Sequence, residues 1–105
     1  MIQVTVYKHS HQYKGFRCEG HAGFGQEGFD IVCAAVSVLT VNTVNSIEAF
    51  TEDSFSGQEG DGLISCMFRG SVSKETELLM DSMVLGLTSM EKNYDNYMQL
   101  RFEEV

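Results

Sequence analysis

Between Asp30 and Ile47 the chain reads DIVCAAVSVLTVNTVNSI, with no charged residue after Asp30. Its many valine and threonine residues favour strands, but a single strand of this length would be unusual in so small a domain. We therefore predict a long helix from Ile31 to Ile47, and Asp30 is a suitable N-cap because its carboxylate can accept a backbone N–H of the first turn. A helix that is apolar around most of its circumference needs cover on more than one side, which predicts a homodimer.

Stretches of alternating apolar and polar residues lie on both sides of this helix. Ile2, Val4 and Val6 alternate with polar neighbours, which is the pattern of a half-buried strand. The strands predicted in this way cover residues 2–7, 16–20, 51–56, 63–69 and 97–104. The turns between paired strands are expected at residues 9–14 and 58–62.

A second helix is predicted to begin after Ser73, whose side chain can cap it. Glu75 and Glu77 lie in its first turn, where the helix dipole favours negative charge. Its apolar stripe consists of Leu79, Met83, Leu87 and Met90. Gly86 interrupts this helix at a cost of about 1 kcal/mol relative to alanine, which is tolerable if another helix packs closely there. The order ββαββαβ predicts an α+β two-layer sandwich with both helices on one face of an antiparallel or mixed sheet.

The composition indicates a single globular domain over residues 1–105, with 43% hydrophobic and 21% charged residues. The formal net charge of −8 argues against direct nucleic-acid binding, because the seven Lys and Arg residues are too few for a phosphate-binding surface. A basic protein or peptide is an easier partner. The N-terminus reads as a strand rather than as a secretion signal, so we expect a cytoplasmic protein with no membrane anchor.

The candidate chemistry lies where the second strand leads into the uncharged helix. His21 ends the strand, and Cys33 falls in the first turn of the helix. A helix N-terminus carries about half a positive charge and favours a thiolate, and a nearby imidazole stabilises the thiolate further. We therefore interpret Cys33 as a nucleophile and His21 as its base. The alternative roles are a buried core thiol and a turn histidine.

Two neighbouring residues have candidate supporting roles. Asp30 could orient His21, although capping the helix is its simpler role. Ser37 lies one turn after Cys33 on the same helix face, so its hydroxyl could meet the thiolate or a substrate, or it could simply pack within the helix layer.

Two other binding patterns occur in the same region. Residues 23–28 match G-x-G-x-x-G, but the preceding strand belongs to a hairpin and the acidic side chains of the loop lie where a pyrophosphate would bind. Cys18, His21 and Cys33 offer three zinc donors, whereas a structural zinc site needs four and usually has C-x-x-C spacing. The third cysteine, Cys66, lies in a predicted strand. The sequence therefore predicts neither a cofactor nor a metal, and its scattered thiols fit a reducing compartment.

The motifs G-H-A at residues 20–22 and D-I-V-C-A-A-V-S at residues 30–37 together resemble the ribosomal-processing cysteine protease family, Prp. The likeness extends over essentially the whole chain, with no departure at the motif positions. It implies an α+β fold, a dimer, and a peptidase that removes a short N-terminal extension from the twenty-seventh large-subunit ribosomal protein near a Phe-Phe motif. It also implies Cys33 as the nucleophile and His21 as its partner.

The loop between the motifs has a predicted role in this interpretation. Gly23, Gly25 and Gly28 give its backbone the freedom to close over a bound peptide, and Phe24 and Phe29 could contact aromatic side chains of the substrate. The alternative function is a non-enzymatic ribosome-associated module that binds a basic protein tail. Thiol alkylation separates the two, because it should stop a protease and spare a binding module.

Overall fold

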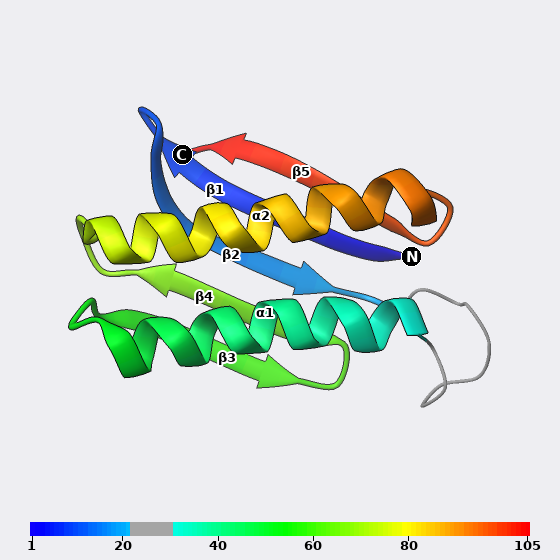
Figure 1. Ribbon diagram of the computed structural model, residues 1–105, viewed down its shortest axis with the longest axis horizontal. Coiled ribbons are helices and arrows are strands. Elements are labelled where there is room, and N and C mark those ends of the chain that lie inside the picture. Colours follow the sequence, from blue (N-terminus) through cyan, green and yellow to red (C-terminus); the bar gives the residue numbers. More distant parts are fainter. Residues whose placement is uncertain (22–30) are drawn as a thin grey trace.

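The computed structural model describes residues 1–21 and 31–105, and Figure 1 shows their arrangement. The strands are β1 (Ile2–His9), β2 (Gln12–Glu19), β3 (Phe55–Gly60), β4 (Leu63–Phe68) and β5 (Met98–Glu104). The helices are α1 (Ile31–Phe50) and α2 (Lys74–Tyr94). Both helices lie on one face of the sheet, which confirms the predicted two-layer α+β sandwich and its order ββαββαβ.

The sheet is mixed, with the strand order β3-β4-β2-β1-β5. The neighbouring strands pair antiparallel, except that β1 and β5 are parallel, with Ile2 opposite Met98. Ile2, Val4 and Val6 of β1 are at most 1% exposed, as their alternation with polar residues predicts. The helix layer covers this apolar face of the sheet (Figure 1).

Helix α1 carries two threonines into the core. Thr40 and Thr43 are buried on the same side of the helix as the apolar residues that pack on the sheet. Their hydroxyls donate to the carbonyls of Val36 at 2.9 Å and Leu39 at 2.7 Å. Each hydroxyl is therefore satisfied within the helix, and burial leaves no unpaired polar group at these two positions.

Helix α2 begins as predicted at Ser73, whose Oγ accepts the backbone N–H of Thr76 at 3.2 Å. A Cβ added at Gly86 would lie 3.2 Å from the side chain of Leu39, so the two helices approach closely there, as expected. The predicted apolar stripe faces the core, where Met83 and Leu87 are buried and Leu79 and Met90 are half-buried against it. The fully buried residues of α2 are Thr76, Met80, Met83 and Leu87.

Several predicted boundaries are wrong, and α1 continues past the predicted end at Ile47 to Phe50. The first hairpin turn is confined to Ser10 and His11, both with positive φ, so residues 9 and 12–14 belong to strands. The third strand is β3 at Phe55–Gly60 rather than residues 51–56, and the turn after it shrinks to Asp61 and Gly62. Pairing with β4 draws this polar, glycine-containing segment into the sheet edge, because tertiary pairing outweighs its low strand propensity.

The segment 51–54 has a different role, which explains its absence from the sheet. The Asp53 carboxylate accepts the backbone N–H of Ser73 at 3.0 Å and its hydroxyl at 2.6 Å, and also the hydroxyl of Thr76. These hydrogen bonds, led by that from the Ser73 hydroxyl, lower the pKa of Asp53. The carboxylate thus fixes the start of α2 to the chain that leads into β3.

Helix α1 buries one side and exposes another. By length and composition alone it could cross a membrane, a test that the core helix of a water-soluble protein also passes. Of an apolar 18-residue stretch of this helix, 28% is buried within the chain. The large apolar side chains of α1 that remain exposed are Ile31, Val38 and Phe50. Cover of these residues by a second copy stays a prediction.

Candidate active site

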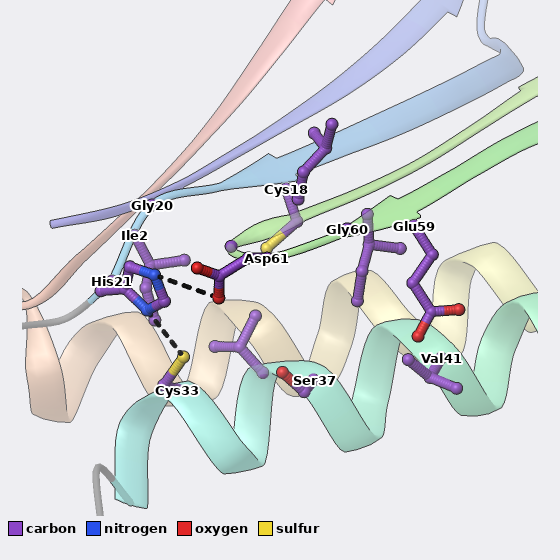
Figure 2. A pocket seen from close by; sticks show the side chains of 14 residues that line it. Ile2, Cys18, Gly20, His21, Cys33, Ser37, Val41, Glu59, Gly60 and Asp61 are labelled. Atoms are coloured by element: carbon purple, nitrogen blue, oxygen red, sulfur yellow. Dashed lines mark hydrogen bonds and ion pairs between the residues drawn. The ribbon is translucent and has the colours of Figure 1, made fainter. Parts of the chain in front are cut away.

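His21 and Cys33 lie side by side at one end of the sheet, as Figure 2 shows. His21 comes two residues after β2, and Cys33 lies in the first turn of α1. The Sγ atom of Cys33 is 4.0 Å from Nδ1 of His21. The start of a helix also carries the positive end of its dipole, which favours a negative sulfur. The structure therefore brings together the two residues that the motifs singled out.

A cavity of about 260 Å³ opens beside this pair. It is smaller than the roughly 300–1,000 Å³ typical of small-molecule sites, so its described walls fit a side chain better than a large cofactor. Residues of β2, α1, β3, β4 and the β3–β4 turn contribute to its lining. They include Cys18, Ser37, Val41, Glu59, Asp61 and Ile64.

Ser37 lines this cavity one turn after Cys33, as its spacing predicts (Figure 2). The side chain is half-buried. Its contact with a substrate or with the thiolate remains a prediction. The other predicted site residues lie outside the described part of the chain, and they are Gly23, Phe24, Gly25, Gly28, Phe29 and Asp30.

The sequence did not single out Asp61 as a residue of this site. It lies in the β3–β4 turn, and its Oδ1 is 3.9 Å from Nε2 of His21. The acidic glycine turn was visible in the sequence, but nothing local connected it with His21. That connection follows from the antiparallel pairing of β2 with β4, which sets Glu19 opposite Leu63 and brings the turn to the end of β2.

The other two cysteines have environments unlike that of Cys33. Cys18 and Cys66 are buried, and burial raises their pKa to about 11 and about 12 respectively, with the nearby Cys33 thiol adding to the effect at Cys18. Both thiols therefore stay protonated near neutral pH, where they are poor nucleophiles and poor metal ligands. Within residues 1–21 and 31–105, no group of three or more His, Cys, Asp or Glu side chains is arranged to hold a metal ion.

A thiol at a helix start, an imidazole 4.0 Å away and an adjacent cavity together form the kind of site that cysteine-dependent hydrolases use. The sequence profile of the family described as cysteine protease Prp matches residues 1–99. The chain therefore belongs to the cysteine protease Prp family, as the motif resemblance indicated.

Individual relatives are similar over most of their length. The ribosomal processing cysteine protease Prp of Bacillus subtilis is 28% identical, and the alignment covers 95% of this chain and 96% of that protein. The crystal structure of a ribosomal processing protease Prp from Staphylococcus aureus, in complex with a covalently linked product peptide, superposes with a TM-score of 0.92. The two sequences are 25% identical, and the superposition covers 98% of this chain and 100% of that one. A Streptococcus mutans crystal structure is 31% identical, with a TM-score of 0.80 and coverage of 100% of this chain and 96% of that one.

Proposed function

We propose that this chain is a cysteine endopeptidase that removes the N-terminal extension of the twenty-seventh large-subunit ribosomal protein, cutting near a Phe-Phe motif. The observation that carries the proposal is the 4.0 Å approach of Cys33 to His21 beside a cavity, within the Prp fold. Relatives named for ribosomal processing support the substrate class. The product peptide covalently linked to the Staphylococcus aureus relative supports a peptide as the ligand.

The reaction uses the Cys33–His21 pair in two stages. Nδ1 of His21 takes the thiol proton, and the Cys33 thiolate attacks the scissile carbonyl carbon to form a tetrahedral intermediate. Backbone N–H groups at the start of α1 are suitable donors to the oxyanion. The imidazolium then gives its proton to the leaving amine, which departs and leaves a thioester. Finally, water activated by His21 releases the N-terminal acid and restores the thiol. A distance of 4.0 Å suits this role, because catalytic contacts in free enzymes often tighten when substrate binds.

Charge at the rim of the cavity supports a basic substrate. Glu59 and Asp61 both line the cavity, and the whole chain carries a net charge of −8. An acidic rim attracts the basic residues that ribosomal proteins use to contact RNA, while the apolar part of the cavity accepts a large side chain. Replacing the Phe-Phe pair of the substrate with Ala-Ala should therefore remove most of the cleavage rate, and an unchanged rate would contradict this substrate assignment.

We also propose that the protein works as a cytoplasmic homodimer. Val38 is 68% exposed and Phe50 is 75% exposed on α1, and a second copy would remove this apolar area from water. Sedimentation at micromolar concentration should report twice the chain mass of 11.7 kDa. A single species of 11.7 kDa would contradict the dimer.

The direct test incubates the extended ribosomal protein with wild-type protein and with Cys33→Ala, and follows both by mass spectrometry. Wild type should release the extension as one peptide, whereas Cys33→Ala should release none. Cys66→Ala is the matched control, because it removes a buried thiol and should retain cleavage. Binding of the extended protein without cleavage by wild type would favour the non-enzymatic module.

A further inference from the structure

We propose that Asp61 positions His21, so that Cys33, His21 and Asp61 act as a triad in which the turn between β3 and β4 supplies the third member. The proposal rests on the proposed function, because it concerns the same thiol and imidazole. It assigns to Asp61 an orienting role for which the sequence had offered Asp30.

The two ring nitrogens of His21 have different partners. Nδ1 faces the Cys33 sulfur at 4.0 Å, and Nε2 faces Oδ1 of Asp61 at 3.9 Å (Figure 2). A carboxylate beside Nε2 favours the tautomer with its proton on that nitrogen, which leaves Nδ1 free to accept the thiol proton. The same carboxylate stabilises the imidazolium once the proton has moved.

The backbone next to Asp61 is hydrogen-bonded to the residue that follows β2. The carbonyl of Gly62 accepts the N–H of Gly20 at 2.9 Å, so the residues next to Asp61 and His21 are hydrogen-bonded to each other. Gly62 has a φ of +69°, and a Cβ there would lie 2.9 Å from Nε2 of His21. The turn thus packs its main chain against the imidazole at a position where a side chain would push the ring away. The hydrogen bond between Gly20 and Gly62 and the packing of Gly62 on the ring therefore keep Asp61 next to His21.

The expected contribution of Asp61 is modest. Its side chain is 87% exposed, so water and salt screen its charge more than in a buried triad. Glu19 on the same rim is itself paired with Arg17 at 3.3 Å. Among residues 1–21 and 31–105, the titratable and charged groups that line the two cavities beside His21 are the amino terminus at Met1, Arg17, Cys18, Glu19, Cys33, Glu59 and Asp61.

The test measures alkylation of Cys33 by iodoacetamide as a function of pH in the full chain, with mass spectrometry of the Cys33 peptide. In Asp61→Asn the pH of half-maximal alkylation should rise by about 0.7 unit, which corresponds to about fivefold in an equilibrium constant. The kcat for cleavage should fall about fivefold, as expected for an exposed ion pair. KM should rise no more than about twofold at low salt, because Asp61 also belongs to the acidic rim. Asp61→Glu should recover most of both losses.

Controls separate a local effect from a general charge effect. Glu52→Gln removes the same charge from the exposed segment beyond the far end of α1, and it should leave the alkylation profile unchanged. Raising the salt concentration to about 1 M should shrink the difference between wild type and Asp61→Asn. Gly62→Ala should move the profile in the same direction as Asp61→Asn, because it displaces the ring.

Two results would overturn the proposal in distinguishable ways. If Cys33 in Asp61→Asn is alkylated with the same pH dependence as in wild type, while in His21→Ala it is not, Asp61 has no positioning role and the Cys33–His21 pair stands. If His21→Ala also alkylates like wild type, the pair itself fails, and the proposed function fails with it.

Discussion

The two ends of this small sheet use carboxylates in opposite ways. At the end where α2 begins, Asp53 accepts hydrogen bonds from Ser73 at 2.6 and 3.0 Å and also from the Thr76 hydroxyl. At the end where α1 begins, Asp61 approaches His21 only to 3.9 Å and is 87% exposed. Short, multiple hydrogen bonds hold a helix in place, whereas long, single contacts leave an imidazole free to exchange protons. Stability and chemistry are therefore expected to respond to different substitutions.

The largest expected effect is at Cys33. Cys33→Ala should abolish cleavage, because no other described thiol is both accessible and near an imidazole. The melting temperature should stay close to that of wild type, because the side chain is only half-buried. Cleavage assays and thermal unfolding check both results. Cys18→Ala should show the reverse pattern, with cleavage retained and stability lowered. Equal loss of cleavage in both variants would contradict the assignment of Cys33 alone as the nucleophile.

The next effect is at His21. His21→Ala should lower kcat by about 10²–10⁴-fold, the usual contribution of a positioned general base. Unfolding should change little, since the side chain is half exposed. Steady-state kinetics with the extended ribosomal protein measure this. A loss of less than about tenfold would remove His21 from the proton-transfer role.

Substitution at Asp53 should produce the opposite result to that at His21. Asp53→Ala leaves the N–H and hydroxyl of Ser73 without their acceptor, and it should lower the free energy of unfolding by about 1–2 kcal/mol. For a domain of this size, each kcal/mol lost lowers Tm by roughly 4–8 °C. Cleavage below the unfolding transition should be unchanged, and a matching loss of activity would show that the two ends are coupled.

The stabilisation by Asp53 should also depend on pH. Its pKa is lowered in the folded protein, chiefly by the hydrogen bond from the Ser73 hydroxyl. A lowered folded-state value stabilises the protein above the ordinary carboxyl range, and this stabilisation is lost as the pH falls through the folded value. The gap in Tm between wild type and Asp53→Ala should therefore narrow on acidification below about pH 4. A gap that widens there would contradict the assigned hydrogen bonds.

The smallest effect is expected at Glu59 on the rim of the cavity. Glu59 is exposed, and its contribution to binding a basic peptide is long-range attraction. Glu59→Gln should raise KM about twofold at low salt, with kcat unchanged. The difference should disappear at high salt, and a change in kcat would place Glu59 in the reaction rather than on its rim.

The same contrast explains which features the sequence could predict. The helix that begins at Ile31 could be predicted from an uncharged run of residues. The helix after Ser73 could be predicted from this capping residue and the acidic residues that follow it. Both are local patterns. Cys33 and His21 were found because the motif spaces them across one loop. Asp61 was missed because its relation to His21 depends on the pairing of β2 with β4, which is a long-range contact. The strand β3 was misplaced for the same reason, since its partner strand rather than its own residues defines it.

The proposed reaction depends above all on Cys33 being the thiol that performs cleavage. The most direct measurement titrates the wild-type protein with iodoacetamide near neutral pH and compares residual cleavage with the fraction of each cysteine modified. Cys18 and Cys66 should remain largely unmodified, because burial raises their pKa to about 11 and about 12. Cleavage should fall in direct proportion to modification of Cys33 and reach zero when Cys33 is fully alkylated. Cleavage that persists with Cys33 fully alkylated would contradict this role of Cys33.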